Sequence, residues 1–356
     1  MDKLMKRENE GTLRSLSFCS GMIDFFSNDY LGYASKATSV VEGQFSSTGS
    51  RLISGNSLIA EDCERYLAQR FHSDTALAFN SGYDANLGFF SAVPQKGDTV
   101  VYDAYVHASI RDGIRLSFAS AFSFKHNDLE DLRKKLSRAK GTIYIAVEGI
   151  YSMTGDQAPL LDIVSIAKEF GAYIFLDEAH SAGVLGVHGS GLAVELGIEK
   201  EVYARLVTFG KAFGAHGACV LTNENTRNYL INFAHSFIYT TALPPDQYVR
   251  IKEILNDPDL ENRRLNLLCN SQRLKEKLEI KDSGISPILM LGAENRVALK
   301  SVSSLIKSAN FAVKPIFHPT VPRAYEGIRV SMHAFNTEDE IDRFATLLRG
   351  LRPIQA

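Results

Sequence analysis

Short apolar runs alternate with amphipathic stretches over the first two thirds of the chain. A glycine-bearing or polar turn follows each run, and the runs are Thr75–Phe79, Thr99–Tyr102, Thr142–Val147, Ala172–Leu176 and Arg205–Thr208. A strand buried on both faces reads as an uninterrupted apolar run, and the alternation of such runs with helices is typical of a parallel sheet covered by helices. The pattern therefore predicts an α/β fold with a mostly parallel central sheet.

The pattern changes from about Pro244. Long charged helices are predicted over residues 246–256 and 262–278, and a shorter segment that mixes helix and strand follows them. Such a change of pattern indicates a domain boundary. We therefore expect an N-terminal arm of residues 1–34, a large domain of residues 35–243 and a smaller α+β domain of residues 244–356.

Reactive side chains follow two of the predicted strands. Asp177 and His180 come after one apolar run, and Thr208 and Lys211 stand at the end of another. Ligands of open α/β sheets bind beyond the carboxyl ends of the strands. These four side chains are therefore expected where a ligand binds.

The four residue types suit pyridoxal phosphate. A lysine amine holds this aldehyde as a Schiff base, and an aspartate beside the pyridine nitrogen keeps that nitrogen protonated, so that the ring accepts electrons. Lys211 and Asp177 fit these roles, while His180 can donate a hydrogen bond to the ring hydroxyl oxygen and Thr208 can bind the phosphate. Taken singly, each residue is an ordinary strand-end cap or surface group, but together they predict a cofactor site.

Three further turns carry candidate cofactor contacts. Over residues 78–86 a strand leads through Gly82 and Tyr83 into a helix, whose first N–H groups attract a phosphate. His107 and Ser152 each follow a predicted strand, where a histidine ring can stack on a planar cofactor and a serine can reach the ring hydroxyl. Alone, these residues read as a capped helix start, a structural histidine and a turn serine. They are candidate cofactor contacts because Lys211 and Asp177 are also present.

The string Asp177-Glu-Ala-His180 also occurs in nucleic-acid helicases, in which its acidic residues hold magnesium on a nucleotide. That function requires an upstream phosphate loop of the form G-x-x-x-x-G-K-[ST]. The only Gly-Lys pair of the chain, Gly210-Lys211, is followed by Ala212, so no hydroxyl is placed for magnesium. The helicase interpretation is therefore disfavoured.

Charge and cysteine content favour small-molecule chemistry. A formal net charge of −2 and a pI near 6.5 indicate no binding surface for nucleic acid or an anionic membrane. The first ten residues are charged, unlike a secretory signal, and no C-x-x-C pair suggests a metal or a redox motif. We expect a cytoplasmic enzyme without a metal site; its cysteines are Cys19, Cys63, Cys219 and Cys269.

The motifs follow one another in the order found in a known family: Ser27–Gly32, Gly49–Gly55, Ala78–Asn86, Val106–Ser109, Glu148–Asp156, Asp177–His180, Thr208–Gly217, Tyr239–Thr241 and Pro319–Pro322. In these segments the chain resembles the α-oxoamine synthases. Members of this family are pyridoxal phosphate enzymes of fold type I that join an amino acid to an acyl thioester and release carbon dioxide. The resemblance implies an aminotransferase-like fold and an acyltransferase reaction.

The resemblance also implies roles for individual residues. Lys211, His107 and Asp177 would be catalytic, as the cofactor-holding base, the residue stacked on the ring and the partner of the pyridine nitrogen. Because the site of this family lies at a dimer interface, a homodimer with shared sites is implied, in which Thr240 or Thr241 would reach the phosphate in the partner subunit. Substrate contacts would come from Arg14, Asn28, His107, Thr320 and Arg329, the last of them as a fork for the amino acid carboxylate.

Within the family, the chain is most similar to the member that condenses L-alanine with a pimeloyl thioester of coenzyme A or acyl carrier protein, in biotin biosynthesis. The local features are Lys125–Asp128, His216–Ala218 and Pro319–Arg323. Glycine C-acetyltransferase is an alternative, because the sequences of residues 83–86 and 109–113 resemble those of that enzyme. A cofactor-binding regulator without turnover is another.

Two departures from the family concern the acyl substrate. The segment 33–48 is shorter than usual, and the helix before Arg14 is abbreviated. Both lie near where the acyl chain and the opposite subunit are expected, so the acyl-chain length stays open.

Overall fold

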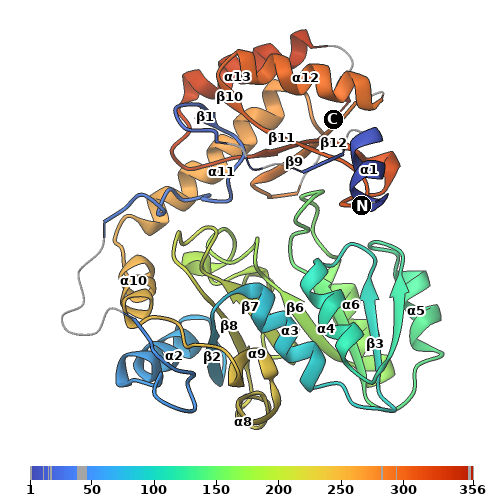
Figure 1. Ribbon diagram of the computed structural model, residues 1–356, viewed down its shortest axis with the longest axis vertical. Helices are drawn as coiled ribbons and strands as arrows, with labels where there is room; N and C mark the ends of the chain where they lie inside the picture. Colours follow the sequence, from blue (N-terminus) through green and yellow to red (C-terminus); the bar gives the residue numbers. More distant parts are fainter. Residues whose placement is uncertain are drawn as a thin grey trace. The chain divides into compact units, whose positions relative to one another are not determined.

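The computed structural model describes residues 2–10, 12–14, 16, 18–37, 46–281, 284–293, 295–351 and 354–355. The chain divides into two compact units (Figure 1). Unit 1 comprises Met1–Asn28, Met153–Gly155 and Asn266–Ala356, and unit 2 comprises Asp29–Ser152 and Asp156–Leu265. The domain boundaries expected after residues 34 and 243 remain a prediction.

Unit 2 is built on a seven-stranded sheet. Its strands are β2 (Thr75–Phe79), β3 (Thr99–Asp103), β4 (Ser120–Phe124), β5 (Ile143–Glu148), β6 (Tyr173–Asp177), β7 (Ala204–Thr208) and β8 (Ala218–Thr222). The spatial order is β2-β8-β7-β6-β5-β3-β4, and β8 is antiparallel to both of its neighbours while the other pairs are parallel. The mostly parallel α/β sheet expected from the apolar runs is confirmed.

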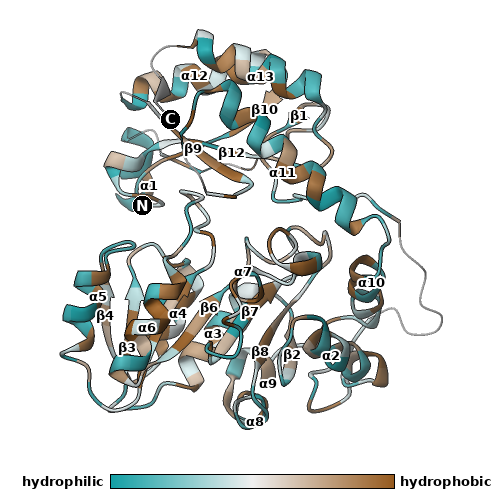
Figure 2. Ribbon diagram, turned by 180° about the vertical axis from the view of Figure 1, so that it is seen from behind, coloured by the Kyte–Doolittle hydropathy of each residue, from teal (hydrophilic) through white to brown (hydrophobic). Residues whose placement is uncertain are grey.

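Helices separate the strands along the chain and bury both faces of the sheet. They are α2 (Leu58–Arg70), α3 (Gly82–Ala92), α4 (Ala108–Leu116), α5 (Leu129–Leu136), α6 (Leu160–Phe170), α7 (Leu192–Glu195), α8 (Glu224–Phe233), α9 (His235–Ile238) and α10 (Pro245–Leu255), with a 3₁₀ turn η1 (Val187–Gly189). Every residue of β7 is buried, and hydrophobic colour follows the central strands in Figure 2. Phe89 and Phe90 of α3 pack on Phe175 of β6, with ring centroids 4.5 and 4.7 Å apart. This packing fixes the position of α3 on the sheet.

Two strands of this sheet have no counterpart among the predicted runs. β4 is an edge strand whose alternating sequence Ser-Ala-Phe-Ser-Phe leaves three of its five residues exposed. β8 follows β7 after a nine-residue turn and pairs with it antiparallel. Two neighbouring parallel strands need a crossover connection, usually a helix, whereas an antiparallel pair does not. No helix therefore separates β7 from β8, and the alternation of strand and helix stops at this point.

The described part of unit 1 contains two small sheets, the short helix α1 (Asp2–Asn9) and the longer helices α12 (Arg296–Ser308) and α13 (Glu338–Gly350). A four-stranded sheet has the order β11 (Lys314–Ile316), β12 (Gly327–Ser331), β9 (Ile288–Ala293) and β13 (Ile354–Gln355), with antiparallel pairs throughout. A parallel pair joins β1 (Ile23–Asp24) to β10 (Phe311–Ala312). The 3₁₀ turn η2 (Arg323–Tyr325) precedes β12, and α11 (Leu260–Lys277) carries the chain from unit 2 into unit 1.

Of the two departures from the family, the structure describes the short helix before Arg14. The helix before Arg14 has eight residues, Asp2–Asn9. Residues 38–45, which make up much of the short segment 33–48, lie outside the described residues. Within the described ranges, no helix is both long enough and apolar enough to cross a bilayer.

Candidate active site

The candidate site lies at the carboxyl ends of the central strands of unit 2. Glu148 ends β5 and is paired in register with Asp177, which ends β6, and Asp177 is in turn paired with Leu206 of β7. Thr208 then ends β7. The parallel register thus brings the last residues of three strands to one edge of the sheet.

Asp177 is a buried carboxylate held by two donors. Asn86 Nδ2 donates to Asp177 Oδ2 over 2.8 Å, and the backbone N–H of Ala179 donates to Oδ1 over 3.0 Å. Asn86 also donates to Ser109 Oγ over 3.0 Å. Asn86 was not singled out as a site residue, because its helical position in α3 gives no sign that it turns toward β6.

Lys211 and His180 are hydrogen-bonded to each other. Lys211 Nζ lies 2.9 Å from His180 Nε2, and His180 Nδ1 lies 2.7 Å from the hydroxyl of Tyr30. Lys211 is partly exposed, whereas His180 and Tyr30 are buried. The sequence placed Lys211 and His180 in the same site, and Tyr30 was overlooked within the matching segment Ser27–Gly32.

His107 starts helix α4 and sits beside these residues. As the N-cap it accepts a hydrogen bond from the Ser109 N–H through Nδ1 over 3.3 Å, and the same nitrogen lies 2.7 Å from Ser109 Oγ. Burial lowers the pKa of His107 below its usual value, although the charge of Asp177 opposes the shift. The His107 ring is therefore a neutral, apolar surface at neutral pH, as a residue stacked on a cofactor ring would be.

Tyr83 borders His107 from helix α3. Their rings meet edge to face with centroids 6.5 Å apart, and the Tyr83 hydroxyl donates to Asp112 Oδ2 over 2.6 Å. This hydrogen bond to a carboxylate raises the pKa of Tyr83. Tyr83 is 43% exposed, so its face is accessible to a ligand.

The predicted phosphate turn packs directly on the end of β7. A Cβ atom at Gly82 would come within 2.5 Å of Thr208 Cγ2, a distance that real Cβ atoms do not reach. The Thr208 hydroxyl is buried and has no hydrogen-bond partner in the described part of the chain. Buried hydroxyls are normally satisfied, so an orphaned one beside a helix N-terminus marks a place for an anion.

Thr240 and Thr241 are tied to this turn within the same chain. Asn80, two residues before Gly82, donates from Nδ2 to Thr240 Oγ1 over 3.1 Å and to the Thr241 carbonyl over 2.8 Å. Both threonines thus lie next to the turn of their own subunit. Their expected reach toward a partner subunit remains a prediction.

Glu148 links two predicted cofactor contacts through their backbones. Its Oε1 accepts from the His107 N–H over 2.5 Å, and its Oε2 accepts from the Ser152 N–H over 3.2 Å. Burial, aided by the neighbouring Asp177 carboxylate, raises the pKa of Glu148 to about 8, although Lys211 and the two N–H groups oppose the shift. Glu148 was missing from the predicted site, and a carboxylate at the end of an apolar run was the signal for it.

His126 ties together the loops that follow β3, β4 and β5. Nδ1 lies 3.0 Å from Asp103 Oδ1, Nε2 lies 2.7 Å from Asp156 Oδ2, and the ring stacks on Tyr105 with centroids 4.1 Å apart. Burial lowers the pKa of His126, but the hydrogen bonds to the two carboxylates outweigh it and raise the pKa to about 9. His126 is therefore an imidazolium at neutral pH and anchors the loop that carries Ser152.

Four of the five predicted substrate residues lie in unit 1, and the fifth, His107, lies in unit 2. Arg329 on β12 is buried and donates to Ser331 Oγ over 2.8 Å and to Asn28 Oδ1 over 2.9 Å. Arg14 donates to Thr320 Oγ1 over 3.2 Å. The structure thus pairs Arg329 with Asn28 and Arg14 with Thr320, as two groups within one unit.

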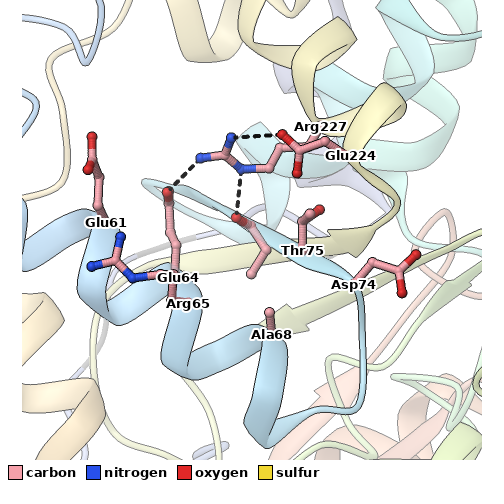
Figure 3. Close-up of a pocket in the computed structure, with 9 residues that line it drawn as sticks. Glu61, Glu64, Arg65, Ala68, Asp74, Thr75, Glu224 and Arg227 are labelled. Atoms are coloured by element: carbon pink, nitrogen blue, oxygen red, sulfur yellow. Dashed lines mark hydrogen bonds and ion pairs between the residues drawn. The ribbon is translucent and has the colours of Figure 1, made fainter.

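A polar pocket of about 400 Å³ lies elsewhere on unit 2, between α2, the start of β2 and α8 (Figure 3). Its buried member Glu64 accepts hydrogen bonds from Arg51 over 2.7 Å, from Arg227 over 3.2 Å and from the Ala78 N–H over 2.9 Å. The pocket shares no lining residue with the candidate site. The carboxylate of Glu64 is thus paired with two arginines, and we assign the pocket a structural role.

Comparison with known proteins gives one consistent result. The family model for class I and II aminotransferases matches residues 20–348. The chain is 40% identical, over 92% of its length and 88% of the relative's, to the 8-amino-7-oxononanoate synthase of Lysinibacillus sphaericus. It is similar in structure to the 8-amino-7-oxononanoate synthase of Francisella tularensis, with a TM-score of 0.78, 29% identity and coverage of 93% of this chain and 97% of that one. A serine palmitoyltransferase of S. paucimobilis with bound PLP has a TM-score of 0.88, 25% identity and coverage of 98% and 96%.

Proposed function

This chain belongs to the class I and II aminotransferase family, and we propose that it is an 8-amino-7-oxononanoate synthase. The reaction joins the α-carbon of L-alanine to the carbonyl carbon of a pimeloyl thioester, breaks the carbon–sulfur bond and releases the thiol carrier and carbon dioxide. Its product would enter biotin biosynthesis. The observation that carries the proposal is the similarity to enzymes of this name over more than nine tenths of the chain, and the strand-end position of Asp177 and Thr208 supports it.

Pyridoxal phosphate fits the residues that are present. The orphaned Thr208 hydroxyl and the Gly82 turn offer an unpaired donor and a helix N-terminus to its phosphate. Asp177 offers a buried, doubly held carboxylate to the pyridine nitrogen, and Lys211 offers an accessible amine to the aldehyde. Each functional group of the cofactor therefore has a counterpart of suitable chemistry.

When bound, the cofactor supplies an electron sink for the bond made and the bonds broken at the alanine α-carbon. The chain supplies the proton transfers and the orientation. Lys211 Nζ takes the α-proton and later returns one to the product, with His180 Nε2 holding the amine at 2.9 Å. Asp177, whose carboxylate is oriented by Asn86, would hold the pyridine nitrogen, and His107 would stack on the ring and keep water from it.

Further contacts follow from the matched motifs. Tyr83 would hold the phosphate with Gly82 and Thr208, and Ser152 would join His180 at the ring hydroxyl. Arg329, oriented by Asn28 and Ser331, would bind the alanine carboxylate through two parallel N–H donors. Arg14 and Thr320, which are hydrogen-bonded to each other, would contact the acyl substrate.

We propose a homodimer with shared sites, in which Thr240 or Thr241 of one protomer contacts the phosphate held by the other. A solution molar mass of twice the 39.3 kDa of one chain is expected, and a monomeric mass would contradict it. All four cysteines are free thiols. This is consistent with a reducing, cytoplasmic environment.

The reaction is tested by turnover and by the spectrum of the loaded protein. Purified protein with pyridoxal phosphate is given pimeloyl thioesters of coenzyme A and of acyl carrier protein, with L-alanine or glycine, and carbon dioxide, free thiol and aminoketone are measured. We expect an absorbance band of the bound cofactor that responds to L-alanine more strongly than to glycine, and equal amounts of the three products. Preference for glycine and acetyl-CoA would instead indicate glycine C-acetyltransferase, and a cofactor that binds without turnover would indicate a regulator.

A further inference from the structure

A tyrosine, a histidine and the cofactor lysine form a hydrogen-bonded row in unit 2. The hydroxyl of Tyr30 lies 2.7 Å from His180 Nδ1, and His180 Nε2 lies 2.9 Å from Lys211 Nζ. Tyr30 is fully buried and His180 is 4% exposed, so water cannot readily replace either partner. The roles given above account for His180 and Lys211 but give Tyr30 none.

In an imidazole, the partner of Nδ1, here Tyr30, affects how Nε2 interacts with its own partner, here Lys211. A neutral imidazole has one N–H and one lone pair, on different ring nitrogens, so the partner of Nδ1 decides what Nε2 can offer. The Tyr30 hydroxyl pairs with Nδ1 and fixes the ring orientation, and the role that the hydroxyl takes, donor or acceptor, goes with one tautomer of the ring. Loss of the hydroxyl removes this contact, so the ring is less restricted in orientation and in tautomer.

We propose that Tyr30 is a positioning residue for the reaction, whose hydroxyl holds His180 in one tautomer with Nε2 directed at the Lys211 amine. The proposal rests on the role of Lys211 as the base in the proposed function. A base that removes a proton from a bound substrate must be held at one distance and angle. His180 provides that hold, and Tyr30 keeps His180 in place.

The hold on His180 is measured without cofactor and without turnover. Protein labelled with ¹⁵N-histidine is examined by NMR, and the signals of His180 are identified by their loss in His180→Gln. In the wild-type protein we expect one protonated and one unprotonated ring nitrogen with distinct shifts. In Tyr30→Phe we expect these shifts to average or to exchange places, and unchanged shifts would overturn the proposal.

Turnover supplies the second readout, with a matched control three residues away. Tyr33 is also fully buried, but its ring lies against Arg263, with the guanidinium carbon 4.8 Å from the ring centroid, and not against His180. We expect Tyr30→Phe to lower kcat roughly tenfold to a hundredfold, with the KM for L-alanine changed less than about threefold. Tyr33→Phe should stay within about twofold of wild type, and a Tyr30→Phe enzyme as active as this control would overturn the proposal.

The outcomes separate this proposal from the proposed function. If the wild-type protein condenses no amino acid, the proposed function fails, while the nitrogen shifts still decide whether Tyr30 holds His180. If Tyr30→Phe does not fold, the wild-type spectrum decides, since fast exchange between the two tautomers of His180 in that protein would contradict a fixed ring.

Discussion

The Thr208 side chain is expected to lower the stability of the cofactor-free protein and to strengthen the binding of the cofactor. Its hydroxyl is buried without a partner, beside the turn where a phosphate is expected. A buried hydroxyl that lacks a hydrogen bond costs about 1–3 kcal/mol of folding free energy. That cost is recovered when the hydroxyl donates to a phosphate oxygen.

The substitution Thr208→Val tests whether the hydroxyl destabilises the cofactor-free protein but favours cofactor binding. The shape is kept and the hydroxyl is lost, so we expect the cofactor-free protein to be as stable as wild type or up to about 1 kcal/mol more stable. The Kd for pyridoxal phosphate is expected to rise roughly tenfold. Denaturant unfolding and a cofactor titration measure the two effects.

A second threonine provides the matched control. The hydroxyl of Thr222, at the end of β8, donates to the Tyr203 carbonyl over 2.9 Å. Thr222→Val should therefore destabilise the protein and leave the cofactor Kd unchanged. The interpretation of Thr208 is wrong if its Val variant behaves in the same way.

Lys211 is the residue whose removal should have the largest effect on the reaction. In Lys211→Ala the amine that holds the cofactor and moves the α-proton is gone, so we expect turnover below about a thousandth of wild type. Asp177 and Thr208 remain, so pyridoxal phosphate should still bind but should be removed by dialysis. Lys200→Ala, at an exposed lysine, serves as the control, and measurable turnover of the Lys211 variant would refute the assigned role.

At the scale of the elements, strand ends carried most of the sequence information. The five predicted runs correspond to β2, β3, β5, β6 and β7, because central strands are apolar throughout and stand out from their turns. The edge strand β4 was missed because a period-2 pattern is not distinctive in so short a segment. β8 is as buried as the predicted strands, but it was missed because it follows β7 without an intervening helix.

Some residues of the candidate site could be predicted from the sequence and others could not. Residues that directly follow a strand, such as Asp177 and Lys211, were found from their position in the sequence. Tyr30 and Asn86 were not, since their contacts arise from tertiary packing, which periodicity does not determine. Glu148 was overlooked although it ends an apolar run, as Asp177 does.

His126 gives a prediction about the loops that follow β3, β4 and β5. Its pKa is raised to about 9 in the folded state, so its contribution to stability is complete below the ordinary histidine pKa of about 6.5 and is lost as the pH rises through about 9. We expect His126→Gln to lower the free energy of unfolding by about 1–2 kcal/mol at pH 7, a value reduced for solvent screening. The difference from wild type should shrink above pH 9.

Denaturant unfolding at a series of pH values measures this difference, with His72→Gln as the control because His72 is exposed. A gap between wild type and His126→Gln that stays constant from pH 7 to pH 10 would show that the charge of the imidazolium does not contribute. A similar loss in the His72 variant would point to a general effect of histidine removal.

For the whole molecule, the expected cofactor contacts and most of the expected substrate contacts fall in different compact units, with His107 of unit 2 expected to serve both. The proposed cofactor residues belong to unit 2, and Arg329 with Asn28, and Arg14 with Thr320, belong to unit 1. Changes in one unit should therefore leave the other function measurable. This makes the two kinds of binding separable by mutation.

Arg329→Ala is the corresponding test. We expect the KM for L-alanine to rise by roughly a hundredfold, as for the loss of a bidentate carboxylate contact, while the Kd for pyridoxal phosphate changes less than about threefold. Arg343, an exposed arginine of the same unit that pairs with Asp339 on α13, serves as the control, and Arg343→Ala should change neither value. A loss of cofactor affinity in Arg329→Ala would mean that binding of L-alanine and binding of pyridoxal phosphate are not separable by mutation.

The contact between Gly82 and Thr208 restricts how this sequence can change over generations. A methyl group at position 82 would collide with the Thr208 methyl at 2.5 Å, so alanine is excluded there unless position 208 gives up that methyl first. Serine is the one replacement that does so and keeps the hydroxyl. We therefore expect Gly82→Ala to disrupt the turn in the wild-type background and to be tolerated better in a Thr208→Ser background.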